Sequence, residues 1–222
     1  MAIGEPEFVN NPEPRCPVIL LVDTSASMSG TPIQQLNTGL KVFKKEVAED
    51  SQAALRVEVA IITFGGSPKL QTDFTPIVDF NPPTLETSGE TPMGAALELA
   101  LEKIRERKET YKRNGIYYYR PWLWLITDGA PTDGNRWQEA ATRIHAGEME
   151  KGFSFFVIAV EGAQMEVLKQ IAVPFRPVVS LNGLQFREMF LWLSKSMKKA
   201  STAKPGAQVP LPPIDGWGAI QN

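Results

Sequence analysis

Two residue types that build common catalytic and crosslinked sites are nearly missing from this sequence. Its 222 residues include one cysteine, Cys16, and one histidine, His145. A lone cysteine excludes an internal disulfide, and such scarcity excludes the Cys- and His-rich clusters that bind zinc. We interpret Cys16 as a small apolar residue at the start of a buried strand, and His145 as a structural or exposed residue of a helix.

The sequence also lacks a large charge of one sign and a long apolar run. The formal net charge is -2, and one short basic run surrounds Lys198-Lys199, so composition gives no reason to expect nucleic-acid binding. The longest apolar run, roughly Pro17 to Val22, is too short to span a membrane. Residues 1–16 carry acids and prolines where a signal peptide needs an apolar stretch. We therefore expect a soluble, cytoplasmic protein that binds neither nucleic acid nor membranes.

What the sequence does contain is an alternation of buried strands and amphipathic helices. Hydrophobic residues make up 43% of the chain, which is enough for a globular core. Apolar runs of the kind found in central parallel strands predict strands at 17–22, 55–64, 122–127 and 153–160, with a short one near 177–179. Apolar residues at helical spacing predict helices at 32–50, 92–104, 136–150, 164–171 and 184–199. Residues 67–90 are expected to be loop-like, with a short extended piece near 77–80.

This order predicts a doubly wound α/β fold, in which helices flank a mostly parallel central sheet. We expect residues 1–15 to be an irregular lead-in, 16–199 to form the domain, and 200–222 to be a proline-rich C-terminal extension. The extension holds an isolated tryptophan, Trp217, which would be unusual in a free linker. We therefore expect the segment around Leu211–Trp217 to be ordered against the domain or a partner.

Hydroxyls and carboxylates gather where ligands bind in such sheets, at the carboxyl ends of the strands. Asp23 and Asp128 each follow a buried strand, and they can meet only if those strands are neighbours. Alternate residues point the same way, so Ser25 and Ser27 project with Asp23, while Thr91 opens a helix as its N-cap. Oxygen ligands without sulfur or imidazole suit Mg²⁺ or Mn²⁺, with Ca²⁺ as a further candidate. The predicted metal ligands are Asp23, Ser25, Ser27, Thr91 and Asp128.

These residues resemble the metal-ion-dependent adhesion site (MIDAS) of von Willebrand factor A domains, whose pattern is Asp-x-Ser-x-Ser, a distant Thr and a distant Asp. The resemblance covers about residues 15–199, with the three motifs in the family's order. It implies direct ligation by Ser25, Ser27 and often Thr91, while Asp23 and Asp128 act partly through water. It also implies a protein-protein interaction module, in which an Asp or Glu of the partner completes the metal's coordination shell.

A narrower resemblance rests on Asp128-Gly129-Ala130-Pro131-Thr132-Asp133, on the Thr63-Phe64 strand end, and on the proline-rich tail with Gly216-Trp217. These features are similar to the bacterial TerY-type proteins, which are associated with tellurium resistance and often paired with a kinase and a phosphatase. That resemblance implies an adaptor in a stress-response or phosphorylation system. Within this segment Asp133, like Glu90, either shapes the rim of the metal site or is a solvated loop acid.

Two other functions remain open. A Mg²⁺-dependent phosphotransferase or hydrolase of the haloacid-dehalogenase kind also has an aspartate after its first strand, but it needs a second acid where this chain has Ser25. No P-loop, GxSxG or GxGxxG motif is present, and a Ser-His-Asp triad would depend on His145, which is predicted in mid-helix. We therefore expect no enzymatic activity. The other alternative is a structural module that keeps the fold but works without metal.

Overall fold

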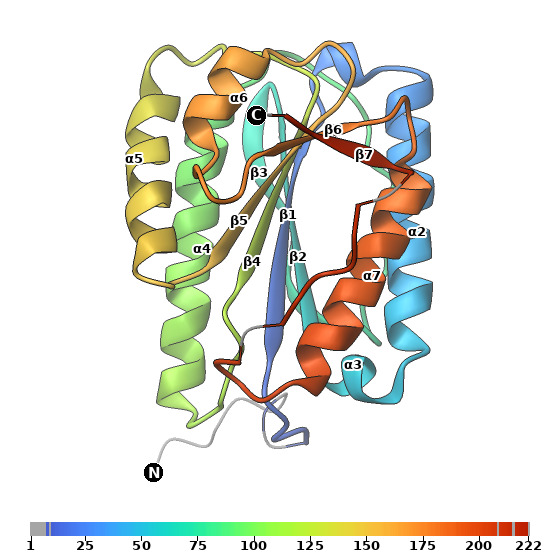
Figure 1. Ribbon diagram of the computed structural model, residues 1–222, viewed down its shortest axis with the longest axis vertical. Helices are drawn as coiled ribbons and strands as arrows, with labels where there is room; N and C mark the ends of the chain where they lie inside the picture. The colour runs from blue at the N-terminus through green and yellow to red at the C-terminus, as the bar shows by residue number, and fades with distance from the viewer. Residues whose placement is uncertain (1–7, 9, 208, 215, 222) are drawn as a thin grey trace.

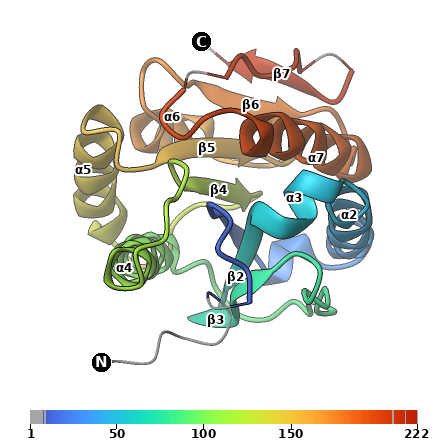
Figure 2. The same ribbon diagram turned by 90° about the horizontal axis from the view of Figure 1, so that it is seen from below.

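The computed structural model describes residues 8, 10–207, 209–214 and 216–221, which form a central sheet between layers of helices (Figures 1 and 2). The strands are β1 (Cys16–Asp23), β2 (Val57–Gly65), β3 (Ser67–Pro76), β4 (Trp122–Thr127), β5 (Ser154–Ala159), β6 (Val178–Leu181) and β7 (Gly218–Gln221). They lie in the order β3-β2-β1-β4-β5-β6-β7. The inner strands are parallel, and the edge strands β3 and β7 are antiparallel to their neighbours. The expected doubly wound, mostly parallel α/β fold is confirmed.

Helices cover both faces of the sheet. They are η1 (Ala26–Met28), α2 (Thr31–Ala48), α3 (Ser51–Arg56), α4 (Met93–Arg113), α5 (Arg136–Met149), α6 (Met165–Ile171) and α7 (Phe186–Thr202). Residues of α4, α5 and α6 form the core on one face, and residues of α2, α3 and α7 contribute to the core on the other (Figure 2). No helix within the described part of the chain is both long enough and apolar enough to cross a membrane.

The central strand β1 shows why the sheet is sandwiched. All of its residues are buried, and their alternation sends Val18, Leu20 and Val22 into one core and Ile19 and Leu21 into the other. A strand that is apolar on both faces is stable only when helices cover both. The sequence pattern of this run therefore fixes its place in the middle of the sheet.

Several elements differ from the sequence-based expectation. The helices η1 and α3 and the strands β3 and β7 were not expected, and β3 occupies much of the segment predicted to be a loop. Helix α4 runs on to Arg113, well beyond its expected end at 104. The extended piece expected near 77–80 is wrong, because residues 77–79 form a turn. This turn still directs Ile77 and Phe80 into the core, where both are buried.

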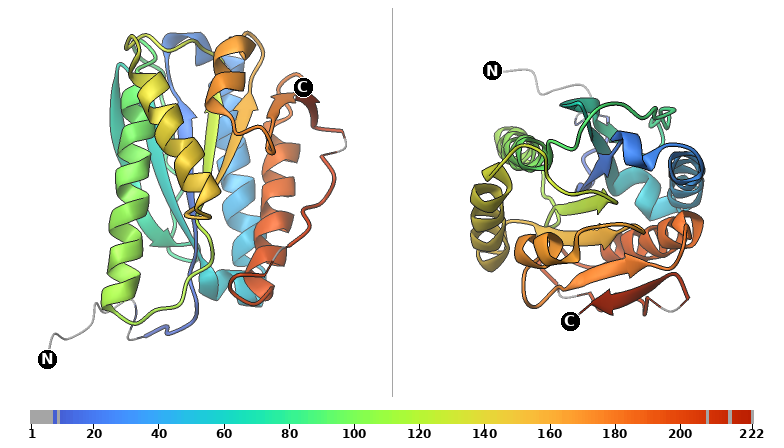
Figure 3. Two further views of the ribbon diagram at one scale, coloured as in Figure 1. Left: turned by 60° about the vertical axis from the view of Figure 1, so that its left-hand side comes forward. Right: turned by 90° about the horizontal axis from the view of Figure 1, so that it is seen from above.

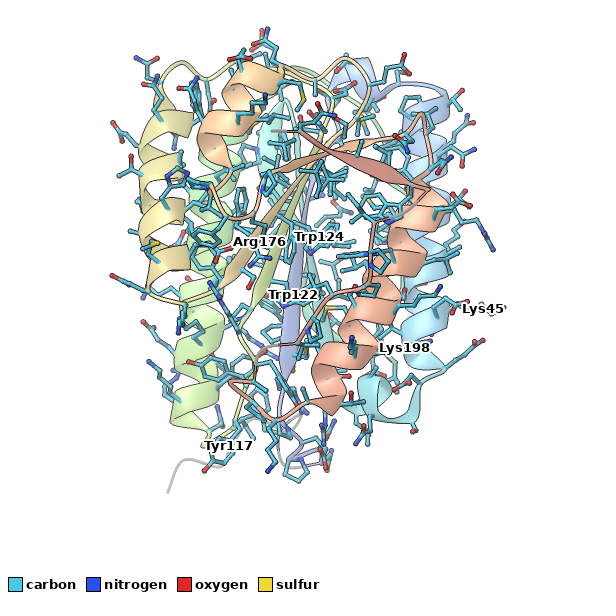
Figure 4. The ribbon with its side chains drawn as sticks, viewed as in Figure 1. Lys45, Tyr117, Trp122, Trp124, Arg176 and Lys198 are labelled. Carbon is cyan, nitrogen blue, oxygen red and sulfur yellow. The ribbon has the colours of Figure 1, made fainter. Side chains whose placement is uncertain are left out.

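The chain after α7 completes the second face of the sheet. Its described residues run back along α7 and end in β7 at the sheet edge (Figures 1 and 3). The indole Nε1 of Trp192 donates hydrogen bonds to the carbonyl oxygens of Pro212 at 3.0 Å and Pro213 at 2.9 Å. Trp217 is buried, with its ring centroid 5.5 Å from that of Trp192. The described residues of the segment around Leu211–Trp217, which are 211–214, 216 and 217, thus pack against the domain, and they help to cover the face that carries Trp124 (Figure 4).

Candidate metal centre

The two aspartates reach the same place because their strands are neighbours. Strand β1 pairs in parallel with β4, and the register joins Val22 to Ile126. Each strand ends at the same edge of the sheet, which lies at the top of Figure 1 and faces the viewer on the right of Figure 3. The sequence predicted that Asp23 and Asp128 can meet only if their strands are neighbours, and the two strands are neighbours in the sheet.

Short hydrogen bonds join the first motif to the aspartate that follows β4. The Ser25 and Ser27 hydroxyl oxygens are hydrogen bonded at 3.0 Å, and the Ser27 hydroxyl donates to Asp128 Oδ1 at 2.8 Å. The backbone amide of Ser25 donates a hydrogen bond to Asp23 Oδ1 at 2.8 Å. This bond turns the chain so that the Asp23 and Ser25 side chains face the same space. The structure thus brings together four of the five predicted residues through direct contacts.

Thr91 joins this group from a third loop. A Cβ atom placed on Gly129 would lie 3.1 Å from Thr91 Oγ1 and 3.4 Å from Asp23 Oδ2, so both oxygens line the space beside this glycine. Backbone bonds hold the loops in register: Ala26 N donates to Gly89 O at 3.1 Å, and Thr132 N donates to Thr91 O at 2.9 Å. Because Gly129 has no side chain, the space beside these two oxygens stays open.

The N-cap of α4 is not the predicted one. This helix begins at Met93, and its capping contacts come from Asp133 in the loop after β4. The Asp133 carboxylate accepts hydrogen bonds from Gly94 N at 3.2 Å and Ala95 N at 2.8 Å. The assignment of Thr91 as cap was therefore wrong, because a carboxylate distant in sequence satisfies these amides. Asp133 has a defined structural role, and the Thr91 hydroxyl is left to face the cluster.

Thr127, next to Asp128 in the sequence, has a role in the cluster that the sequence did not predict. Its hydroxyl donates to Asp23 Oδ2 at 2.5 Å and accepts a hydrogen bond from Gly129 N at 3.1 Å. The side chain is fully buried, so these bonds hold the Asp23 carboxylate in one orientation. A hydroxyl residue at the end of an otherwise apolar strand was the available signal for this role.

The electrostatics of the cluster favour a cation. Burial raises the pKa of the Asp23 and Asp128 carboxyls, although hydrogen bonds from Ser25, Thr127 and Ser27 partly oppose this effect. Neither aspartate forms an ion pair with any residue in the described ranges. Two buried carboxylates without a basic partner need compensation, which a divalent cation would supply. Ser27 is exposed, so the cluster opens to solvent on that side.

The donor set also restricts the kind of ion. Among the described residues, no three or more His, Cys, Asp or Glu side chains gather in a way that could hold a metal. A metal in this cluster would therefore depend on hydroxyl oxygens beside the two carboxylates. Such all-oxygen donors fit a hard divalent cation better than a zinc site built on thiolates or imidazoles.

Several solved structures are similar to this chain at low sequence identity. Proximal thread matrix protein 1 from the mussel byssus is 18% identical with a TM-score of 0.56; the match covers 84% of this chain and 49% of that one. Another structure of that protein is described as having a zinc-occupied MIDAS motif. Manganese-loaded TRAP protein from Plasmodium vivax is 18% identical with a TM-score of 0.55, and the match covers 81% of this chain and 73% of that one. BatB from Bacteroides thetaiotaomicron is 18% identical with a TM-score of 0.56, and the match covers 85% of this chain and 100% of that one.

These structural similarities support the fold, whereas the family is identified by a comparison of the sequence. The chain spans about half the length of the thread matrix protein. No curated protein matches it in a sequence comparison. A comparison with protein families matches residues 18–180 to the von Willebrand factor type A domain, and this region contains all five clustered residues. The chain therefore belongs to the von Willebrand factor type A domain family.

Proposed function

We propose that this chain is a metal-dependent protein-protein interaction module. A Mg²⁺ or Mn²⁺ ion is held by oxygen atoms of Asp23, Ser25, Ser27, Thr91 and Asp128. The observation that carries the proposal is the convergence of three hydroxyl side chains on two buried carboxylates that have no basic partner in the described part of the chain. The manganese-loaded and zinc-occupied relatives lend further support, because they share the fold.

The ligand roles follow the MIDAS pattern, with Ser25, Ser27 and Thr91 as direct ligands and the two aspartates acting partly through water. Two carboxylates balance the charge of one dication, but their partly indirect binding leaves the ion with mainly neutral direct ligands. An Asp or Glu of a partner protein supplies the missing negative ligand. The loops 23–30, 88–91 and 128–133 form the contact surface, on the side where Ser27 is exposed.

Thermal unfolding tests the metal site. Replacing chelator with Mg²⁺ or Mn²⁺ should raise the melting temperature, because an ion that binds only the native state stabilises it by about 2.7 kcal/mol at a hundred times its Kd. The double variant Ser25→Ala/Ser27→Ala should lose this rise. Ser67→Ala, an exposed serine at the start of β3, is the control and should keep it. A full rise in the double variant would place the ion elsewhere, whereas no rise in the unmodified chain would favour the metal-independent alternative.

Partner binding tests the role of the ion. Once a partner is identified, its capture should require Mg²⁺ or Mn²⁺, and it should be lost in chelator and in Thr91→Ala or Asp128→Ala. Both variants should remain folded by circular dichroism. Capture that continues unchanged in chelator would contradict the proposed role of the metal.

We further propose a place for the module in the cell. The segment Asp128–Asp133 and the proline-rich tail support a TerY-type adaptor in the cytoplasm of a bacterium, acting in a tellurium-resistance or stress-response system with a kinase and a phosphatase. Deletion of the gene should increase tellurite sensitivity, and an Asp23→Ala copy should fail to restore growth. Normal tellurite resistance in the deletion strain would contradict this placement.

The module acts without catalysis. An enzyme of the haloacid-dehalogenase kind would need an acid at position 25, where this chain has a serine. Incubation with Mg²⁺ and a panel of phosphate esters should therefore release no phosphate above background. Release that disappears in Asp23→Ala would overturn this part of the proposal.

A further inference from the structure

A second surface of the molecule concentrates positive charge. Its members are lysines at the same helical spacing on two helices. They are Lys41, Lys44 and Lys45 of α2 and Lys195, Lys198 and Lys199 of α7, called the lysine surface below. Residues three and four apart lie on the same side of a helix, so each helix presents a lysine stripe.

The two helices lie side by side, so the exposed lysines of both face solvent on the same side of the sheet. A Cβ atom on Gly39 of α2 would lie only 2.3 Å from the Phe190 ring of α7, which shows how closely the helices approach. Lys198 Nζ lies 3.7 Å from Glu46 Oε2, an ion pair that crosses from one helix to the other. Figure 4 labels Lys45 and Lys198 on these adjacent helices, at a similar height in the view.

The charge of this surface is largely uncompensated. Apart from Lys198, none of its lysines forms an ion pair with a described residue. Lys41, Lys45, Lys195 and Lys199 are exposed. The acids of the two helices are Glu46, which pairs with Lys198, and Glu188, which pairs with Arg187 at 3.5 Å. The C-cap residue of α2, Glu49, is a third and exposed carboxylate beside Lys45, so six lysines face three acids. A chain with a net charge of -2 thus carries a locally basic face.

We propose that the lysine surface binds an acidic segment of a partner protein. Ammonium groups on flexible stems act as point charges, which suits carboxylates spread along a flexible chain better than a ligand of fixed geometry. A membrane-binding surface combines basic residues with large apolar ones that insert into the lipid. Neither α2 nor α7, both described in full, has an exposed large hydrophobic residue. Recognition of nucleic-acid bases depends mainly on arginine at base edges and aromatic side chains at base faces, and the lysine surface contains neither.

The surface also deepens the proposed function, although it does not depend on the metal. Helix α2 starts at Thr31, just after the metal-site loop, and the lysines follow in its second half. At about 1.5 Å per residue, Lys45 lies about 20 Å along the helix from its start. An acidic partner could therefore place one carboxylate on the metal and others on the lysine surface within a single interface of ordinary size.

Binding of an oligoglutamate peptide to the full chain tests the proposal. The measurement is made by fluorescence anisotropy in chelator, so that failure of the metal site cannot affect it. The test variant is Lys41→Gln/Lys45→Gln/Lys195→Gln. The control variant Lys69→Gln/Lys112→Gln/Arg143→Gln removes the same charge from exposed positions on β3, α4 and α5.

The test variant should bind oligoglutamate about tenfold more weakly than the unmodified chain, which corresponds to about 0.5 kcal/mol for each of the three exposed ion pairs that it loses. The control variant should bind as the unmodified chain does, and oligoglutamine should not bind. Equal losses in both variants would show a general charge effect and overturn the proposal. Preferred binding to phosphatidylserine vesicles or duplex DNA, lost in the test variant, would assign the surface to a lipid or nucleic acid instead and would also overturn it.

Discussion

Two buried tryptophans in the same aromatic contact differ in their hydrogen bonding, which allows a matched test of how the tail is held. The Nε1 of Trp192 donates to the carbonyl oxygens of Pro212 and Pro213, whereas the Nε1 of Trp217 has no partner among the described residues. The side chains are 8% and 3% exposed, so each change to phenylalanine removes a similar part of a buried ring.

The expected difference follows from the hydrogen bonds alone. Trp192→Phe loses one N–H donor whose hydrogen bond is shared between two carbonyl oxygens, which contributes about 0.5–1.5 kcal/mol. Trp217→Phe removes an indole N–H that is unpaired in the folded state, which offsets part of the lost burial. We therefore expect Trp192→Phe to be the less stable variant by about 0.5–1.5 kcal/mol, or about 1–6 °C in melting temperature for a chain of this size.

Circular dichroism at a far-ultraviolet wavelength is the suitable assay, because it does not depend on the tryptophans that are replaced. Thermal and urea unfolding of both variants should be compared with the unmodified chain at one pH and salt concentration. Equal stability losses, or a larger loss in Trp217→Phe, would refute the reasoning. Such a result would mean that the contact of Trp192 with the proline carbonyls does not hold the tail.

Three further predictions concern other parts of the fold. Burial raises the pKa of the Cys16 thiol to about 12, so a disulfide reagent at pH 8 should label it only after unfolding; rapid labelling of the native chain would contradict this. Glu58→Gln removes the counter-charge of buried arginines and should cost about 3–5 kcal/mol in urea unfolding, whereas the exposed Glu106→Gln should cost less than about 1 kcal/mol; similar losses would refute the distinction. Asp133→Ala and Asp50→Ala each remove a helix cap and should each lower the free energy of unfolding by about 1 kcal/mol. Only Asp133→Ala should also weaken the Mg²⁺-induced rise in melting temperature. An unchanged rise in Asp133→Ala would show that this cap and the metal site are independent.

The central part of the fold could be predicted from the sequence because its signal is strong. Strands such as β1 and β4 are buried on both faces, and a short run of apolar residues is typical of such strands. The edge strand β3 has mostly half-exposed residues, so its sequence lacks that signal. Helix α3 is a single short element capped by Asp50, too short to show a helical period. The strand β7 has only four residues, and its existence depends on pairing with β6, which no local pattern reveals.

The residues of the candidate site could be predicted better than their hydrogen bonds. The spacing of Asp23, Ser25 and Ser27 places them on one side of the chain, and parallel strand order brings Asp128 to them. The sequence could not show which group caps α4, because the choice between Thr91 and Asp133 depends on how two distant loops pack. Each is an ordinary capping residue, and only the folded arrangement of the β4–α5 loop decides between them.

The position of the tail also has a consequence for the order in which the chain folds during synthesis. Strand β1 can pair with β2 and β4 early, but the face that carries Trp124 and Phe156 is closed by α7 and the segment after it. On a ribosome, this aromatic face stays uncovered until residues 186–217 have emerged. A nascent chain that stalls before that point would present exposed tryptophan and phenylalanine rings, which are preferred targets of chaperones and a cause of aggregation. Emergence of residues 186–217, rather than formation of the sheet, is therefore the step that covers these aromatic rings.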